Sequence, residues 1–372
     1  MSKPRVLDLF SGAGGLSEGF IQAGFHVVAS VEKDKNAVET QRANHSFNSE
    51  GCKTEIIQED LREPEKVISR LESIGINEVD VIIGGPPCQG FTRANRQTAT
   101  KDNPLNSLFF YYADLVEHYQ PKVFVMENVG DLERFAGGSV LKDIKVTFDE
   151  IGYYCDSKVL NAINFGVPQS RNRIFLIGVR KNSNLEIKFP EPFIEKDGGI
   201  KTTTVWDAIS DLPVLSNGAS VDELSYANTE PENSYQEVMR SKTNGRVSNN
   251  LVTRNSDLIL QRYKHIPPGG NWRDIPDELM GNYKDKNRCH SWIYLRLKED
   301  LPSVTITHFR KSMLIHPREH RGLSVREAAR LQSFPDHFVF KGRIGSQQQQ
   351  VANAVPPLLA KAVANQIMLI LT

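Results

Sequence analysis

The chain has 372 residues, which is long for one domain and sufficient for two. Its hydrophobic fraction of 39% and charged fraction of 24% are those of a soluble globular protein. The 45 basic and 45 acidic residues give a net charge of zero. The first residues do not resemble a secretory leader, and no uninterrupted apolar run of about 18 residues occurs. We therefore expect a soluble, cytoplasmic protein without a membrane segment.

Cysteine and histidine spacing gives little support for a metal or disulfide framework. The four cysteines form no CxxC pair and do not stand at zinc spacing with histidines. His316 and His320 are four residues apart, a spacing that can bind a metal on a helix. Pro317 and the missing glutamate of an HExxH motif argue against that interpretation. We expect no metal.

The first 180 residues alternate short apolar segments, typical of buried strands, with amphipathic segments typical of helices. We expect strands at 5–10, 26–32, 54–60, 79–85, 122–129 and 173–180. We expect helices at 15–24, 34–45, 107–119 and 140–153. This alternation predicts an α/β fold with a doubly wound, mostly parallel sheet.

The alternation stops near residue 185, and the chain to about residue 320 is rich in Pro, Gly, Asn and Ser. Such a stretch is either a separate domain or a set of functional loops on a scaffold. A helix is expected at 324–334, where Ser324 and Glu327 form a capping box, and a last helix at 356–371. We expect a large domain of residues 1–185 plus 341–372 and a smaller, loop-rich domain of residues 186–340.

A glycine-rich turn follows the first expected strand in "DLFSGAGGL". Gly12, Gly14 and Gly15 permit a tight turn that leads into a helix N-terminus, where free amides favour an anionic group. Ser17 breaks the GxGxxG pattern, so a dinucleotide fingerprint is absent. Taken alone, such a turn is often only a turn.

Acidic residues follow the second and third expected strands. Ligands of open α/β sheets bind beyond the carboxyl ends of the strands, where Glu32 can accept from ribose hydroxyls. Asp60 is placed to accept from an adenine amino group. Together with the glycine-rich turn, these acids suit a nucleoside that carries a carboxylate, as S-adenosylmethionine does.

The segment "VIIGGPPCQGFT" places a single thiol, Cys88, where a buried strand ends. Most cysteines are small buried hydrophobes, and that interpretation applies here as well. However, Pro86 and Pro87 fix the backbone, so the loop holds one thiol at the carboxyl edge of the sheet, where a lowered pKa would create a nucleophile. Glu127 follows the next strand at the same edge and could protonate a ring nitrogen during the attack.

The segment "QSRNR" alternates along an extended chain, so Gln169, Arg171 and Arg173 share one face. Two guanidinium groups facing one way could hold the glutamate, a base carbonyl or a phosphate. Taken alone, the pair is as well explained by a surface charge cluster.

Charge is unevenly distributed in the second half of the chain. Residues 181–237 contain 4 basic and 11 acidic residues, whereas residues 240–320 contain 15 basic and 8 acidic residues. The basic segment is interleaved with aromatic residues, which suits a polyanion with exposed bases. A solvated, loop-rich face explains the same charge equally well.

The motifs "DLFSGAGG", "GGPPCQGF", "ENV", "QSRNRIFLIG", "RGLSVREAARLQSFPD" and "QQVANAVPP", in this order, resemble the signature blocks of DNA (cytosine-5) methyltransferases. The resemblance covers most of residues 5–180 and 290–365. It implies the fold of S-adenosylmethionine-dependent methyltransferases, and it places the variable target-recognition domain at about 200–290. The Pro-Pro-Cys-Gln run and the long Arg-Glu-Ala-Ala-Arg run are highly specific.

The resemblance implies a mechanism on these residues. Cys88 adds to C6 of a cytosine while Glu127 engages N3, and C5 then takes the methyl group of S-adenosylmethionine. A base removes the C5 proton and the thiolate leaves, while Arg171 and Arg173 steady the base and the neighbouring backbone. The thiol cannot reach C6 in a stacked duplex, so the cytosine must be flipped out of double-stranded DNA.

The resemblance also assigns binding residues. Those expected around S-adenosylmethionine, whose product is S-adenosylhomocysteine, are Phe10, Gly12, Gly14, Gly15, Leu16, Glu32, Asp60, Pro87 and Asn353. Those expected to contact DNA are Gln89, Gln169, Arg240, Arg254, Arg273 and Arg310. The last motif departs from the family pattern, because Ala352 stands where the family usually has glycine before the asparagine.

Three alternatives remain beside a restriction-modification methyltransferase. A transfer-RNA cytosine methyltransferase is disfavoured because its typical Cys-Phe-Thr run is absent. The intact Cys88, Glu127, Arg171 and Arg173 argue against a silent DNA-binding homologue, and the glycine pattern argues against an NAD-dependent oxidoreductase. We expect a monomer that methylates one short DNA sequence, with a companion endonuclease possible.

Overall fold

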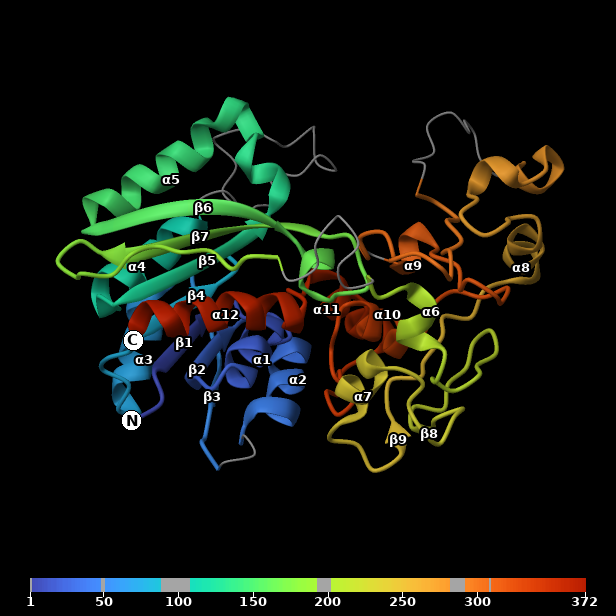
Figure 1. Cartoon of the computed structure of the whole chain (residues 1–372), viewed down its shortest axis with the longest axis horizontal. Helices are drawn as coiled ribbons and strands as arrows, with labels where there is room; N and C mark the ends of the chain where they lie inside the picture. Colours follow the sequence, from blue (N-terminus) through green and yellow to red (C-terminus); the bar gives the residue numbers. More distant parts are fainter. Residues whose placement is uncertain (1, 48–50, 88–107, 193–201, 282–291, 308) are drawn as a thin grey trace. The chain divides into compact units, whose positions relative to one another are not determined.

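The structure, a computed structural model, describes residues 2–47, 51–87, 108–192, 202–281, 292–307 and 309–372 (Figure 1). The chain divides into two compact units. Unit 1 comprises residues 1–165, 172–193 and 355–372, and unit 2 comprises residues 166–171 and 194–354.

Unit 1 is built on a seven-stranded sheet with the strand order β3-β2-β1-β4-β5-β7-β6. Its strands are β1 (Arg5–Leu9), β2 (His26–Glu32), β3 (Glu55–Gln58), β4 (Val81–Gly84), β5 (Val123–Val129), β6 (Tyr153–Asn161) and β7 (Asn172–Arg180). Strands β1 to β5 pair in parallel, and β7 runs antiparallel to both β5 and β6. The expected α/β fold with a mostly parallel sheet is confirmed. The strand order reverses between β1 and β4, which is where open α/β sheets bind their ligands.

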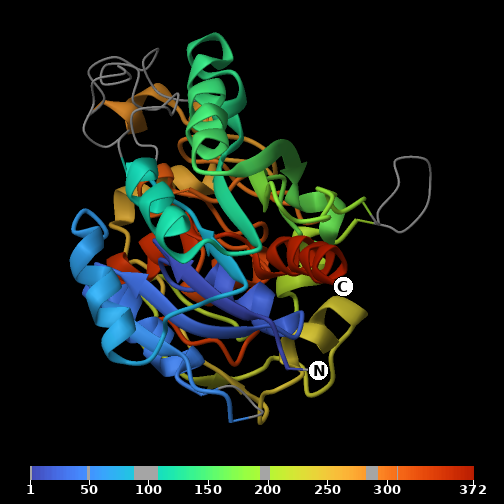
Figure 2. The same ribbon diagram turned by 90° about the vertical axis from the view of Figure 1, so that its left-hand side faces the viewer.

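Helices cover both faces of this sheet. They are α1 (Gly15–Gln22), α2 (Lys35–His45), α3 (Pro64–Ser73), α4 (Leu108–Tyr119), α5 (Ser139–Glu150) and α12 (Pro357–Leu371). Helix α1 packs against α12, whereas α4 packs against α3 and α5. The two views place α12 on the face opposite α4 and α5, so the sheet is doubly wound as expected (Figures 1 and 2).

Among the described strands and α-helices of unit 1, α3 and β6 were not expected from the sequence. Strand β6 is the edge strand next to β7, and its burial pattern is mixed. An edge strand packs less apolar surface than a central one, so its sequence carries no apolar run. The expected helix at 140–153 accordingly ends at Glu150, before this strand begins.

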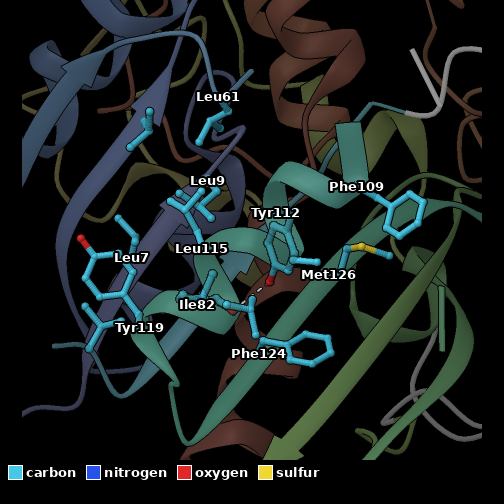
Figure 3. Close-up of a cluster of buried hydrophobic side chains, with 14 of the residues drawn as sticks. Leu7, Leu9, Leu61, Ile82, Phe109, Tyr112, Leu115, Tyr119, Phe124 and Met126 are labelled. Atoms are coloured by element: carbon cyan, nitrogen blue, oxygen red, sulfur yellow. Dashed lines mark hydrogen bonds between the residues drawn. The ribbon is translucent and has the colours of Figure 1, made fainter. Parts of the chain in front are cut away.

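The core under α4 fixes the geometry of the central strands. Leu7, Ile82 and Phe124 are fully buried and face this helix as part of one apolar cluster (Figure 3). Tyr112 lies among them, and its hydroxyl donates to the carbonyl oxygens of Ile82 and Val125, at 3.1 Å each. Fully burying such a side chain contributes about 1.5–3 kcal/mol. This cluster therefore holds β1, β4 and β5 rigidly at the edge where the candidate residues lie.

Helix α12 is apolar because it is a packing element of unit 1. Within the described residues, the segment Ile344–Leu371 is the one stretch long and apolar enough to cross a membrane, by length and composition only. Core helices meet the same test, and the face of α12 that includes Leu359, Val363 and Ile367 is fully buried. The contact with α1 is close, since a Cβ added at Gly19 would clash with the Ala360 Cβ.

Unit 2 consists of short elements joined by long loops. They are α6 (Val205–Ile209), β8 (Leu224–Ser225), α7 (Ser234–Arg240), β9 (Arg246–Val247), α8 (Asp257–Lys264), α9 (Phe309–Ser312), α10 (Val325–Leu331) and α11 (Ile344–Asn353), with 3-10 turns at Trp272–Asp274 and Asp277–Met280. The predicted capping box of α10 is confirmed, because the Ser324 side chain accepts from the Glu327 amide and the Glu327 carboxylate accepts from the Ser324 amide.

Buried charged side chains hold these loops together. Arg330 is fully buried and binds Asp336 at 2.6 Å and Asp211 at 3.1 Å. Arg326 is equally buried and donates to the carbonyl oxygens of Ser248 and Phe338. Guanidinium groups can satisfy several carbonyls at once, so loops without regular hydrogen-bond ladders still bury their backbone.

The units differ from the expected domains at residues 166–171 and 341–354, which cluster with unit 2, and at residues 186–193, which cluster with unit 1. Side chains of α11 explain the difference at residues 341–354. Asn249 donates to Gln347 Oε1 at 3.2 Å, and Gln348 donates to the Thr253 hydroxyl at 2.9 Å. Helix α11 is therefore bonded to the loops of unit 2, whereas α12 belongs to unit 1.

Candidate active site

The glycine-rich turn after β1 requires backbone conformations that favour glycine. Gly12 has φ +53° and Gly14 has φ +88°, and Phe10 between strand and turn has φ +53°. The Gly14 amide donates to the Ser11 carbonyl at 2.9 Å, which closes the turn immediately before α1. A Cβ added at Gly12 would meet no atom within 4 Å, so one side of this peptide faces open space.

Glu32 ends β2 beside the turn, as the sequence predicts. Its Oε2 accepts from the Gly12 amide at 2.9 Å, and its Oε1 accepts from the Asp34 amide at 2.8 Å. These two amides fix the rotamer of the carboxylate. Each carboxylate oxygen has two lone pairs, so further hydroxyl donors can still bind.

Asp60 follows β3 and pairs with Arg62. Arg62 Nη2 donates to Asp60 Oδ2 at 2.5 Å, and the Arg62 amide donates to Oδ1 at 3.1 Å. The side-chain bond from Arg62 lowers the pKa of Asp60, so this carboxylate is charged at neutral pH. A ligand amino group that donates to Asp60 would bind it in addition to the bonds from Arg62.

The loop after β4 begins with Gly85, Pro86 and Pro87 at the switch point. Cys88 and Gln89 lie outside the described residues, so their side chains are not placed. Asn128 on β5 donates to the Pro86 carbonyl at 3.0 Å and thereby anchors the start of this loop. Asn128 was not among the site residues expected from the sequence, although it stands beside Glu127 in the motif "ENV".

Glu127 and Arg173 form an ion pair between neighbouring antiparallel strands. Glu127 Oε1 lies 2.8 Å from Arg173 Nε, and the side chains are 11% and 13% exposed. A Cβ at Gly85 would lie 3.0 Å from Glu127 Oε2, so the carboxyl group lies against the start of the β4 loop. Burial lowers the pKa of Arg173 and the Glu127 charge opposes that shift. This arrangement presents one oriented carboxyl group at the edge of the sheet.

The expectation that Gln169, Arg171 and Arg173 share one face is corrected by the structure. Arg171 is 1% exposed, and its guanidinium donates to the carbonyl oxygens of Ile306, Ala352 and Ala354 at 2.8–3.0 Å. Gln169 is fully buried, donates to the Leu331 carbonyl and accepts from the Ile306 amide. Both side chains bind backbone within unit 2, whereas Arg173 binds Glu127, so the three do not share one open face. Contact of Gln169 with DNA and of Arg171 with the base stays a prediction. The alternation along an extended segment predicted a common face, but it could not predict which backbone carbonyls accept hydrogen bonds from the two side chains.

Arg240 is a further correction, because its guanidinium serves the interior of unit 2. It donates to the carbonyl oxygens of Asn228 and Thr229, and it lies 3.9 Å above the Tyr226 ring. The other arginines expected on DNA are exposed, namely Arg254, Arg273 and Arg310. Arg273 lies 4.8 Å above the Trp272 ring.

The remaining cofactor candidates have mixed surroundings. Leu16 is 4% exposed, whereas Phe10 and Pro87 are half-buried. Asn353 is exposed at the end of α11 and accepts from Gln349 at 2.6 Å. Within the described residues, no group of three or more His, Cys, Asp or Glu side chains could hold a metal ion.

A buried acid on β1, Asp8, was also not expected from the sequence. Asp8 on β1 is fully buried, and Ser17 on α1 donates to its Oδ2 at 2.6 Å. Burial raises the pKa of Asp8 to about 7, against the effect of the Ser17 bond. The acidic residue within an apolar strand was the signal in the sequence.

Comparison with known proteins assigns nearly the whole chain to one family. Residues 4–369 match the family of C-5 cytosine-specific DNA methylases. The chain is 40% identical to the Type II methyltransferase M1.HphI of Haemophilus parahaemolyticus over 97% of its length and 86% of the relative. It is 36% identical to the Type II methyltransferase M.DdeI of Desulfomicrobium norvegicum, over 98% and 88% of the two chains.

Solved structures agree with this relationship. A crystal structure described as that of a prophage-encoded DNA modification methyltransferase of E. coli has a TM-score of 0.78 and 27% identity, and each chain is 99% covered. The Dnmt2 methyltransferase of S. pombe has a TM-score of 0.60 at 16% identity, with 99% of this chain and 98% of that chain covered. At that identity, the second comparison supports the fold alone.

Proposed function

The chain belongs to the family of C-5 cytosine-specific DNA methylases, and from that premise we propose that it transfers the methyl group of S-adenosylmethionine to C5 of a cytosine flipped out of duplex DNA. The enzyme class, a Type II DNA (cytosine-5) methyltransferase, rests on the family match and on the full-length relatives. The finer mechanism rests on the Glu127–Arg173 pair beside the loop that leads to Cys88.

The residues around the glycine-rich turn fit S-adenosylmethionine. Gly12 leaves open space where another residue would carry a side chain, and Glu32 is held at its edge by two backbone amides. Glu32 would accept from the ribose hydroxyls, and Asp60 from the adenine amino group. When bound, S-adenosylmethionine supplies the electrophilic methyl group. Phe10, Leu16, Pro87 and Asn353 complete the proposed lining.

Cys88 is the proposed nucleophile. Its sulfur forms a bond to C6 of the cytosine while Glu127 donates a proton to N3, which leaves electron density at C5 for the methyl transfer. Removal of the C5 proton by a base then re-forms the C5–C6 double bond as the C6–S bond breaks and Glu127 recovers the N3 proton. Arg173 holds the Glu127 carboxyl in position throughout.

Of the two tasks that the resemblance implies for Arg171, holding the base and holding the neighbouring backbone, its contacts favour the second. Its three carbonyl partners include Ala352 and Ala354, which flank Asn353. We assign it to positioning this segment rather than to contact with the base. The Ala352 carbonyl accepts one of these bonds, so the position without the family's glycine is held by a guanidinium group.

Unit 2 is the proposed target-recognition region. Its exposed arginines, Arg254, Arg273 and Arg310, would neutralise DNA phosphates or contact base edges. Gln89 is a further candidate for DNA contact from the Cys88 loop. We propose that the enzyme works as a cytoplasmic monomer in a restriction-modification system, where a companion endonuclease would cut the unmethylated site.

The experiment that tests this function uses the purified full chain with S-adenosylmethionine and unmethylated phage DNA, followed by bisulfite sequencing. We expect 5-methylcytosine in one short motif, and no methylation with Cys88→Ser, whose DNA affinity should remain within about threefold because only one sulfur atom changes. An active serine variant would remove Cys88 as the nucleophile. Methylation of transfer RNA instead of DNA would overturn the proposed substrate.

A further inference from the structure

Helix α2 buries three polar side chains, Thr40, Gln41 and His45, and the last two lie one helical turn apart. Gln41 is 0% exposed and His45 is 2% exposed, beside the buried Ala37 and Val38. Residues four apart lie on the same face of a helix, so this pair forms a polar patch within an otherwise apolar surface. Buried polar groups are costly unless they are hydrogen-bonded, so their partners indicate what the patch does.

The Gln41 amide binds three groups around the glycine-rich turn. Nε2 donates to the Gly12 carbonyl at 2.7 Å and to the Ser11 hydroxyl at 2.8 Å. Oε1 accepts from the Ser30 hydroxyl on β2 at 2.5 Å. One side chain thus ties α2 to both the turn after β1 and the strand that ends in Glu32.

These bonds leave the Gly12 residue with little freedom. Its amide donates to Glu32 and its carbonyl accepts from Gln41, so its polar groups are bound on both sides. Gly12 has φ +53° and no side chain that could pack into the open space on its Cβ side. The orientation of its peptide is therefore held by the two hydrogen-bond partners. Loss of the Gln41 bond would free the carbonyl and, with it, the peptide that orients Glu32.

His45 fixes the same turn two residues later. A Cβ at Gly14 would lie 2.7 Å from His45 Cε1, so the turn and α2 are in direct contact. His45 Nε2 lies 3.0 Å from Glu18 Oε2, which connects α2 with the first turn of α1. His45 thus supports the turn by packing against Gly14, whereas Gln41 supports it by hydrogen bonds.

We propose that Gln41 is a positioning residue of the cofactor site. It holds the Gly12 peptide, and through Gly12 the Glu32 carboxylate, in the geometry that receives S-adenosylmethionine. The inference rests on the proposed function of the turn. Gln41 would not contact the cytosine or the reacting methyl group, so its effect belongs to cofactor affinity rather than to the chemical step.

The chain offers a matched control in unit 2. Gln236 is also fully buried; its Nε2 donates to the Asp207 carbonyl at 2.9 Å and to the Ser210 hydroxyl at 2.8 Å, and its Oε1 accepts from the Glu232 amide at 2.7 Å. The substitutions Gln41→Met and Gln236→Met each remove one bond to a carbonyl oxygen, one bond to a hydroxyl oxygen and one bond accepted by Oε1. The Oε1 donor is a hydroxyl at Gln41 and a backbone amide at Gln236. Methionine preserves length and flexibility, so both cores remain filled.

Isothermal titration of S-adenosylhomocysteine into the full chain is the first measurement, with thermal unfolding of both variants beside it. We expect Gln41→Met to weaken binding by about tenfold or more, and Gln236→Met to weaken it by less than about twofold, because Gln41 bonds to the Gly12 carbonyl of the turn and Gln236 bonds within unit 2. Both variants should lower the unfolding temperature to a similar degree. With saturating DNA and varied S-adenosylmethionine, Gln41→Met should raise KM for S-adenosylmethionine and keep kcat within about threefold of the unmodified enzyme.

The outcomes separate the inference from the function on which it rests. If both methionine variants bind S-adenosylhomocysteine equally well, or lose affinity only in proportion to unfolding, Gln41 is merely structural. A lower kcat with unchanged KM for Gln41→Met would also overturn the inference. If the unmodified chain itself does not bind S-adenosylhomocysteine, the proposed cofactor fails instead.

Discussion

Individual side chains in unit 1 carry charges that the fold could not accommodate without specific partners. Glu127 is paired with Arg173 although both are nearly buried. Asp8 is fully buried with one hydroxyl donor, Ser17. Groups with such surroundings concentrate at functional sites, because the function requires them where stability alone would favour apolar residues.

Replacement of Arg173 by methionine tests the carboxyl group at residue scale. The variant removes the ion pair that orients Glu127, so we expect kcat to fall by about 100-fold or more, the range of a positioned general acid. Affinity for S-adenosylhomocysteine should not change. Arg180→Met on the same strand is the control, since Arg180 donates to the Gln120 carbonyl at the other end of β7. Equal activity of the two variants would remove Arg173 from the mechanism.

Asp8 gives the protein a pH-dependent stability. Burial raises its pKa from 3.8 to about 7, and the nearby Glu32 charge adds to that rise. Between these values the unfolded chain releases the proton first, so rising pH destabilises the folded state by roughly 1.4 kcal/mol per unit. Asp8→Asn does not ionise and keeps a partner for Ser17.

We therefore expect the unfolding temperature of Asp8→Asn, relative to the unmodified chain, to rise between pH 5 and pH 8, with the change ending near the pKa of about 7. Differential scanning fluorimetry of both proteins over that range measures the difference. Two melting curves that shift in parallel would show that Asp8 keeps the same ionisation in the folded and unfolded states.

At the scale of elements, packing between α1 and α12 joins the ends of the chain within unit 1. Gly19 lies against the backbone of α12, and an added Cβ would meet the Lys361 amide nitrogen at 2.6 Å. Glycine inside a helix is disfavoured by conformational entropy, so its presence here has a packing reason. The close approach lets α12 seat its apolar face beside the sheet.

Substitution of Gly19 by alanine should therefore destabilise the protein, although alanine is the better helix former. We expect a loss of about 1–3 kcal/mol from the overpacked contact. Gly281→Ala is the control, because a Cβ there meets nothing within 4 Å and its φ is negative. Chemical unfolding of both variants provides the comparison. A stabilised Gly19→Ala protein would mean that the helices separate at little cost.

At the scale of the whole molecule, the chain divides its proposed tasks between two units of different construction. Unit 1 has long strands and amphipathic helices, whereas unit 2 has short elements held by buried arginines such as Arg326 and Arg330. Loops carried on a fixed scaffold can vary in sequence without loss of the scaffold. That construction suits a region that reads different DNA sequences in different enzymes.

Exchange of residues 240–290 for the corresponding segment of another family member tests this division. We expect the methylated motif to change, while affinity for S-adenosylhomocysteine stays within about threefold, because base readout and cofactor contacts lie on different residues. Bisulfite sequencing gives the motif and calorimetry gives the affinity. If cofactor affinity collapses together with specificity, the segment belongs to the cofactor-binding unit after all.

Sequence motifs predicted much of unit 1 because their physical causes are local. Apolar runs correspond to β1, β4 and β5 of unit 1, and in unit 2 the capping box at Ser324 and Glu327 begins α10. The edge strand β6 was missed because its side chains have mixed burial and form no run. The positions of Glu32 and Asp60 after parallel strands followed from the order of strands alone.

By itself, the sequence determined the fold class, the family and the order of the residues that carry the proposed chemistry. The tertiary structure decided which of these side chains remain available. Arg171, Gln169 and Arg240 were expected to face a ligand, yet backbone carbonyl oxygens of other segments accept hydrogen bonds from them. For Arg171 these are the carbonyls at positions 306, 352 and 354. It also decided that Gln41 holds Gly12, 29 residues away. Hydrogen bonds between segments far apart in the chain depend on the folded path of the backbone, which local patterns of residues do not contain.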